Sequence, residues 1–170
     1  MGLCKTVKIN QGKERQGMIK LKVQHVGMFV ADLEETVAWW KDIFGFEKVY
    51  EGDFYLPDYG EARMFWIDAG TILVECFEFK GLAKLDRERY WKEYGTKHIS
   101  LTMGIDDDFD GFVSYLEDKG VNITIHATHS AARLSAQFGP EYTKDTKVVF
   151  IDDPSGNTIE IQQNAPYKEL

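Results

Sequence analysis

The chain has 170 residues, of which 44% are hydrophobic and 28% charged, and its formal net charge at pH 7 is -8. This balance is typical of a globular protein with enough apolar mass for one domain or two small fused halves. The negative charge makes nucleic acid and membrane surfaces poor partners, because both are anionic, and no apolar stretch is long enough to span a bilayer.

The N-terminal region and the cysteines indicate the compartment. Residues 1–19 are polar and are predicted to form a tail ahead of a domain spanning residues 20–170. The first six residues match a loose myristoylation pattern that is common by chance, so we expect a plain polar leader. Cys4 and Cys76 form no closely spaced pair, which favours a reduced, cytoplasmic protein over a disulfide scaffold.

The first half of the domain is predicted to be a strand, a helix and three further strands. A strand at 20–30 precedes a helix that begins after Asp32, a good N-cap, and ends at Gly45. Strands are expected near 46–51, 62–68 and 71–79. The charged segment 82–94 is predicted to be helical.

The second half repeats this order. A strand at 97–104 is followed by a helix at 108–119, stopped by Gly120, and by strands near 121–126, 145–151 and 157–163. The helix is expected to bury four side chains, those of Phe112, Val113, Tyr115 and Leu116. The two units, about 20–80 and 96–163, each open with a histidine and close with a glutamate. This degenerate repeat predicts an α+β fold made of two βαβββ units.

Four polar residues of the repeat share a position within the predicted strands. Successive side chains of a strand point to opposite faces, so the apolar sets, such as Val26 with Met28 and Val74 with Cys76, pack against the helices. The residues of opposite parity are His25, Glu75, His98 and Glu160. Two imidazoles and two carboxylates suit one first-row divalent ion and leave positions open for water or substrate. A single strand histidine is more often structural, and it is the repetition that favours a metal site.

The long connection 126–144 carries His126, His129 and Arg133. Long loops are often lids or binding loops, and we expect this one to cover the site. A second metal site at the two histidines is the weaker alternative.

The sequence resembles the vicinal oxygen chelate superfamily, which includes glyoxalase I, methylmalonyl-CoA epimerase, extradiol dioxygenases and the fosfomycin and bleomycin resistance proteins. The segments that carry the resemblance span residues 23–163 and read VQHVGMFVADLEETVAWWKDIFGFE, TILVECFEF, GTKHISL and FIDDPSGNTIEIQ. The resemblance implies a glyoxalase-like fold, in which the paired units form an open, mixed β-sheet cup around a metal. It also implies that His25, Glu75, His98 and Glu160 are the metal ligands.

Within this superfamily the resemblance favours the metal-dependent isomerases and lyases. Extradiol dioxygenases need only one carboxylate ligand, and resistance proteins that merely sequester drugs lack this ligand set. The positions that contact glutathione in bacterial glyoxalase I are Phe29 and Phe79 here, which disfavours a glutathione substrate. The epimerases carry a catalytic glutamate in a turn that corresponds to Leu56–Gly60, where Asp58 is the candidate base. The alternative is that Pro-Asp-x-Gly is simply a common turn sequence.

The implied function is that of an isomerase or epimerase that shifts a proton next to a carbonyl through a metal-chelated enediolate. Glu160, with Asp58 on the opposite face, would move the proton, and Phe29, Phe77 and Trp66 would keep the site apolar. The ion is one of Ni, Co, Mn, Fe or Zn, and the substrate is a small molecule with vicinal oxygens. A homodimer is expected by resemblance. The alternatives are a glyoxalase-type lyase, an extradiol-type dioxygenase, or a non-catalytic binding or resistance protein.

Overall fold

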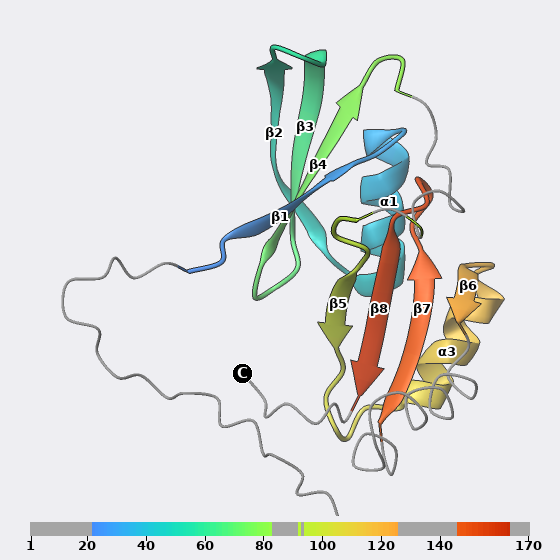
Figure 1. Ribbon diagram of the computed structural model, residues 1–170. Helices are drawn as coiled ribbons and strands as arrows, with labels where there is room; N and C mark the ends of the chain where they lie inside the picture. The colour runs from blue at the N-terminus through green and yellow to red at the C-terminus, as the bar shows by residue number, and fades with distance from the viewer. Residues whose placement is uncertain (1–21, 83–91, 93, 126–145, 164–170) are drawn as a thin grey trace, which may run out of the picture.

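The computed structural model describes residues 22–82, 92, 94–125 and 146–163. These residues form two units of one helix and four strands each (Figure 1). The first unit comprises β1 (His25–Phe29), α1 (Leu33–Phe44), β2 (Glu47–Leu56), β3 (Gly60–Asp68) and β4 (Leu73–Phe79). The second comprises β5 (Ile99–Thr102), α3 (Phe109–Asp118), β6 (Asn122–Ile125), β7 (Lys147–Asp152) and β8 (Thr158–Gln163). The predicted α+β fold of two βαβββ units is confirmed.

Each unit contains its own mixed sheet, and the two sheets have equivalent topologies. The strand orders are β1-β4-β3-β2 and β5-β8-β7-β6. In each sheet the first strand pairs in parallel with the last, and the other pairings are antiparallel. The strands that carry the start of each repeat, β1 and β5, are therefore edge strands of their sheets.

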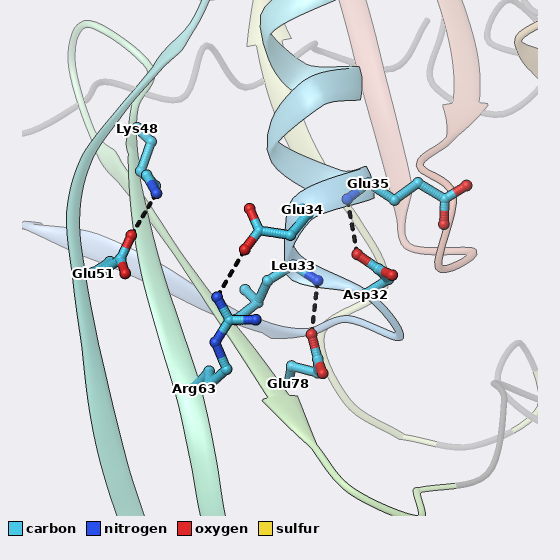
Figure 2. Close-up of polar contacts among 8 residues, drawn as sticks. All are labelled: Asp32, Leu33, Glu34, Glu35, Lys48, Glu51, Arg63 and Glu78. Atoms are coloured by element: carbon cyan, nitrogen blue, oxygen red, sulfur yellow. Dashed lines mark hydrogen bonds and ion pairs between the residues drawn. The ribbon is translucent and has the colours of Figure 1, made fainter.

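The start of α1 is fixed by side chains from two elements (Figure 2). Asp32 caps the helix, because its carboxylate accepts a hydrogen bond of 2.8 Å from the Glu35 amide. The Glu78 carboxylate, from β4, accepts a second bond of 2.9 Å from the Leu33 amide. Gly45 ends the helix in the left-handed conformation with φ 73°, as its position predicts.

The apolar strand faces meet in one core that both units share. Val74, Cys76 and Ile159 are fully buried, and the partly buried Val26 and Met28 pack against the same cluster. The alternation predicted from the sequence is thus confirmed. In α3 the buried residues are Phe109, Val113 and Leu116. Phe112 and Tyr115, which were also expected to be buried, are only partly buried, and Phe112 contacts Phe44 of α1.

The two units are joined at two places. The turn between β7 and β8 bonds to the end of β1: Asn157 Nδ2 donates to the Phe29 carbonyl (3.1 Å), and Ser155 Oγ accepts from the Ala31 amide (2.8 Å). At the other end of the core, the Tyr115 hydroxyl donates to the Asp42 carbonyl (2.6 Å). These contacts bring α1 and α3 together, and both helices contribute to the shared core. In Figure 1, α1 is drawn beside the first sheet and α3 beside β6 and β7.

The observed boundaries differ most from the expected ones in three strands. β1 and β5 are shorter than predicted, whereas β2 continues through Gly52 and Asp53 to Leu56 because its whole length pairs with β3. Pairing thus overrides the weak strand preference of these two residues. Within the described residues no helix is long and apolar enough to cross a membrane. The expected tail, the loop with His126, His129 and Arg133, and all but three residues of the predicted helix 82–94 lie outside the described residues.

Candidate metal centre

The first His–Glu pair lies on the helix-free face of the first sheet. His25 Nε2 is 3.3 Å from Glu75 Oε2, and the other imidazole nitrogen, Nδ1, is 2.8 Å from Gln24 Oε1. The Trp66 indole N–H donates to Glu75 Oε1 at 2.9 Å, and its ring stacks on His25 with centroids 5.9 Å apart. The neighbours therefore orient both potential ligands, as outer-sphere groups do around bound metals.

The second pair repeats this geometry. His98 Nε2 is 3.3 Å from Glu160 Oε2, and the His98 ring meets Phe150 edge-on with centroids 5.5 Å apart. Ser100 also hydrogen-bonds the Glu160 carboxylate. The side chains of the two histidines are each 38% exposed, whereas those of Glu75 and Glu160 are 13% and 16% exposed. Each unit thus presents one accessible imidazole beside a largely covered carboxylate.

Strand register explains why the two pairs match. Glu75 lies opposite Gly27, and Glu160 lies opposite Ser100, so each glutamate faces the residue two positions after the histidine. The next strand places an aromatic residue beside each glutamate, Trp66 in the first unit and Phe150 in the second. Sequence reasoning missed Gln24 and Phe150; aligning the third strands of the two units would have paired Phe150 with Trp66.

The pKa values of His98 and Glu160 in the second pair are both shifted from their ordinary values. The hydrogen bond to Glu160 raises the pKa of His98, although burial opposes this. Burial alone would raise the pKa of Glu160, but the bonds from His98 and Ser100 outweigh it and hold that pKa below its ordinary value. Glu160 is therefore ionised at neutral pH and is a competent ligand or proton acceptor.

The structure does not bring the four predicted ligands together. Among the described residues no group of three or more His, Cys, Asp or Glu side chains is arranged to hold a metal ion. The apolar faces of both sheets contribute to one core, and each histidine pair lies on the opposite face of its own sheet. Each chain therefore presents two half-sites, each with one nitrogen and one carboxylate.

The predicted apolar environment is present beside the first pair. Phe29 and Phe77 share the face of His25 and Glu75, with ring centroids 6.1 Å apart, and Phe29 is 43% exposed. Phe79 lies further along the same face, 5.0 Å from Phe29 between centroids. The face of the second pair is more polar, since its residues include Ser100, Thr102 and Gln162.

Asp58 lies far from the first pair along the sheet. It belongs to the turn between β2 and β3, where the Tyr59 amide bonds the Leu56 carbonyl at 3.0 Å. Trp66, beside Glu75, lies six positions along β3 from Gly60 at the turn, which corresponds to about 20 Å of extended strand. The role of Asp58 as a second base stays a prediction. The alternative, that Asp58 is simply a turn residue, is supported by the hydrogen bond between Tyr59 and Leu56.

Comparison with known proteins now places the chain. A family model described as Glyoxalase/Bleomycin resistance protein/Dioxygenase superfamily matches residues 22–161. The chain belongs to this superfamily. The expected membership is therefore confirmed, and no curated protein sequence matches the chain significantly.

Solved structures of other superfamily members are similar in fold. A trypanothione-dependent glyoxalase I from Leishmania major is 15% identical with a TM-score of 0.58, and the match covers 85% of this chain and 87% of that one. The fosfomycin resistance protein FosX from Listeria monocytogenes, complexed with Mn(II) and sulfate, is 15% identical with a TM-score of 0.59, covering 88% and 96%. FosX from Mesorhizobium loti is 18% identical with a TM-score of 0.54, covering 85% and 91%. At these identities the likeness establishes the fold alone.

Proposed function

We propose that this superfamily member is a divalent-metal-dependent enzyme whose site forms between two copies of the chain. One copy would contribute His25 and Glu75, and the other His98 and Glu160. The observation that carries the proposal is the matched geometry of the two half-sites, each with a nitrogen 3.3 Å from a carboxylate oxygen on an accessible face. Two nitrogens and two oxygens suit Ni, Co, Mn, Fe or Zn. The Mn(II) in the similar Listeria protein supports this donor chemistry.

The edge strands favour a homodimer as the way to join the half-sites. β1 and β5 carry or adjoin the two histidines, and each has a single neighbour in its sheet. An unpaired strand edge is a template for pairing with another chain. In a symmetric dimer, β1 of one copy meeting β5 of the other would form two equivalent sites. A metal-dependent homodimer is thus the proposed state.

The chemistry that this donor set supports best is proton transfer next to a carbonyl. A divalent ion at such a site would bind two neighbouring substrate oxygens and stabilise negative charge on them. The chain's own contribution is the base. The bonds from His98 and Ser100 hold Glu160 ionised, so it can accept the substrate proton. In the dimer, Phe29 and Phe77 of the other copy would form an apolar wall opposite it.

We propose an isomerase or epimerase first, with a glyoxalase-type lyase or extradiol-type dioxygenase as the alternative. An epimerase needs a second base, and the distance along β3 makes Asp58 a weaker candidate than Glu160. Deuterium incorporation from solvent at the carbon next to the carbonyl would mark proton transfer, and oxygen uptake with bound iron would mark the dioxygenase. A protein that binds no metal would instead fit the non-catalytic resistance class.

The shared site is tested by mixing inactive variants. Neither His25→Ala nor His98→Ala should bind metal tightly, because each breaks both sites of its own dimer. After unfolding and refolding together in equal amounts, half the dimers are mixed and each holds one intact site. Metal content should therefore recover to about a quarter of the wild-type value.

A matched pair of variants controls this experiment. His25→Ala mixed with Glu75→Ala places both changes in the same half-site, so no mixed dimer has an intact site and no metal should return. If the first mixture also recovers nothing while both variants are dimeric, the site is not shared. Full metal binding by His98→Ala would show that the wrong ligands were chosen.

A further inference from the structure

A cavity of about 760 Å³ lies where the end of β1 meets the turn between β7 and β8. This volume is within the range of small-molecule sites. One end of the cavity is at Gly27, which lies opposite Glu75 in register. A Cβ atom built at Gly27 would be 3.6 Å from Glu75 Oε2, so the cavity begins directly beside the first half-site.

The cavity has an aromatic wall. Phe29, Tyr59 and Phe79 line it, and their ring centroids lie 5.0 to 5.7 Å apart in edge-to-face and tilted contacts. Phe29 is 43% exposed and Tyr59 51% exposed. Leaving such rings open to water costs free energy, and apolar patches of this kind mark binding sites on soluble proteins.

Two charged residues line the cavity, Glu78 and Lys80. Glu78 lines it, but its carboxylate accepts the Leu33 amide at the start of α1 (Figure 2). Lys80 is the one cation among the described residues that line the cavity. The cavity therefore offers a ligand one ammonium group, together with the three aromatic rings that line it.

We propose that this cavity binds an aromatic ring that carries an acidic group. The ring lies on Phe29, Tyr59 and Phe79, and the acidic group pairs with Lys80. If the proposed metal site is correct, this ring is the remote part of the substrate whose vicinal oxygens reach the Glu75 end. The binding of the ring itself does not depend on the metal.

The test uses 1-naphthoate as a probe, titrated into metal-free protein by calorimetry and compared with the uncharged 1-naphthamide. Naphthoate should bind more tightly than naphthamide. Phe29→Ser should weaken both by about tenfold, because the ring contact is lost. Lys80→Gln should weaken naphthoate alone, to the affinity of naphthamide. Tyr94→Ser, at a fully exposed tyrosine outside the cavity, should change neither.

Several outcomes would overturn the proposal. These are the absence of naphthoate binding at millimolar concentration, wild-type affinity in Phe29→Ser, or equal affinity for the two probes in wild type. If circular dichroism finds Phe29→Ser unfolded, Tyr59→Ser replaces it, because Tyr59 lies in an exposed turn and should give the same loss. His98→Ala should keep naphthoate binding while losing metal, so failure of the metal site and failure of this cavity are distinguishable.

Discussion

Asn157 should contribute more to the free energy of unfolding than a turn residue usually does, because its side chain joins the two units. Its Nδ2 group donates to the Phe29 carbonyl of the first unit (3.1 Å) and to Asp153 Oδ2 (2.9 Å). Asp153 is only 4% exposed, and burial raises its pKa despite bonds from Asn157 and Ser155. The Asp153 carboxylate is therefore kept charged by the hydrogen bonds that it accepts from Asn157 and Ser155.

Asn157→Ala removes one bond to a buried carboxylate and one to a carbonyl. A bond to a charged group contributes about 1.5–3 kcal/mol and a neutral bond about 0.5–1.5 kcal/mol, so the loss should be about 2–4.5 kcal/mol. For a chain of this size that lowers Tm by roughly 5–15 °C. Asn122→Ala is the matched control, because Asn122 Nδ2 bonds Asp152 Oδ2 (2.7 Å) within the second unit alone.

Urea unfolding followed by two probes measures the effect. All four tryptophans precede His98 in the sequence, so their fluorescence reports on the first half of the chain, whereas circular dichroism reports on both units. The two transitions should coincide in each variant because the units share one core. An Asn157→Ala loss no larger than that of Asn122→Ala, or separate transitions in wild type, would refute the reasoning.

Two further predictions concern the half-sites. Trp66→Phe removes the indole donor that orients Glu75 and should weaken metal binding about 10- to 100-fold by calorimetry, whereas Trp39→Phe on α1 should not. Unchanged affinity in Trp66→Phe would contradict the orienting role. The raised pKa of His98 and the lowered pKa of Glu160 stabilise the metal-free fold while both groups are charged. The His98 contribution is lost as pH rises through its folded pKa, and that of Glu160 as pH falls through its own. His98→Gln should therefore lower the free energy of unfolding most between about pH 4.5 and 6.5, and a pH-independent loss in urea titrations would exclude the ion pair.

The family and the units could be predicted because their signals are local. Asp32 and Gly45 bound α1 through contacts within a turn of chain, and strand alternation alone placed His25 with Glu75 and His98 with Glu160 on helix-free faces. Such patterns depend on the period of one element and not on how elements pack.

The relation between the two pairs depends on contacts far apart in the sequence. Whether four ligands meet in one chain is decided by which faces of the two units pack together. Here the contacts of Phe44 with Phe112 and of Asn157 with Phe29 hold the two units together. Likewise, the extension of β2 to Leu56, which carries Asp58 away from Glu75, follows from pairing with β3. The sequence by itself determined that each unit carries a histidine and a glutamate on the same face of its sheet. Only the tertiary structure decided that the two pairs do not meet within one chain, because burial of a shared apolar core outweighs any attraction between polar faces that water already solvates.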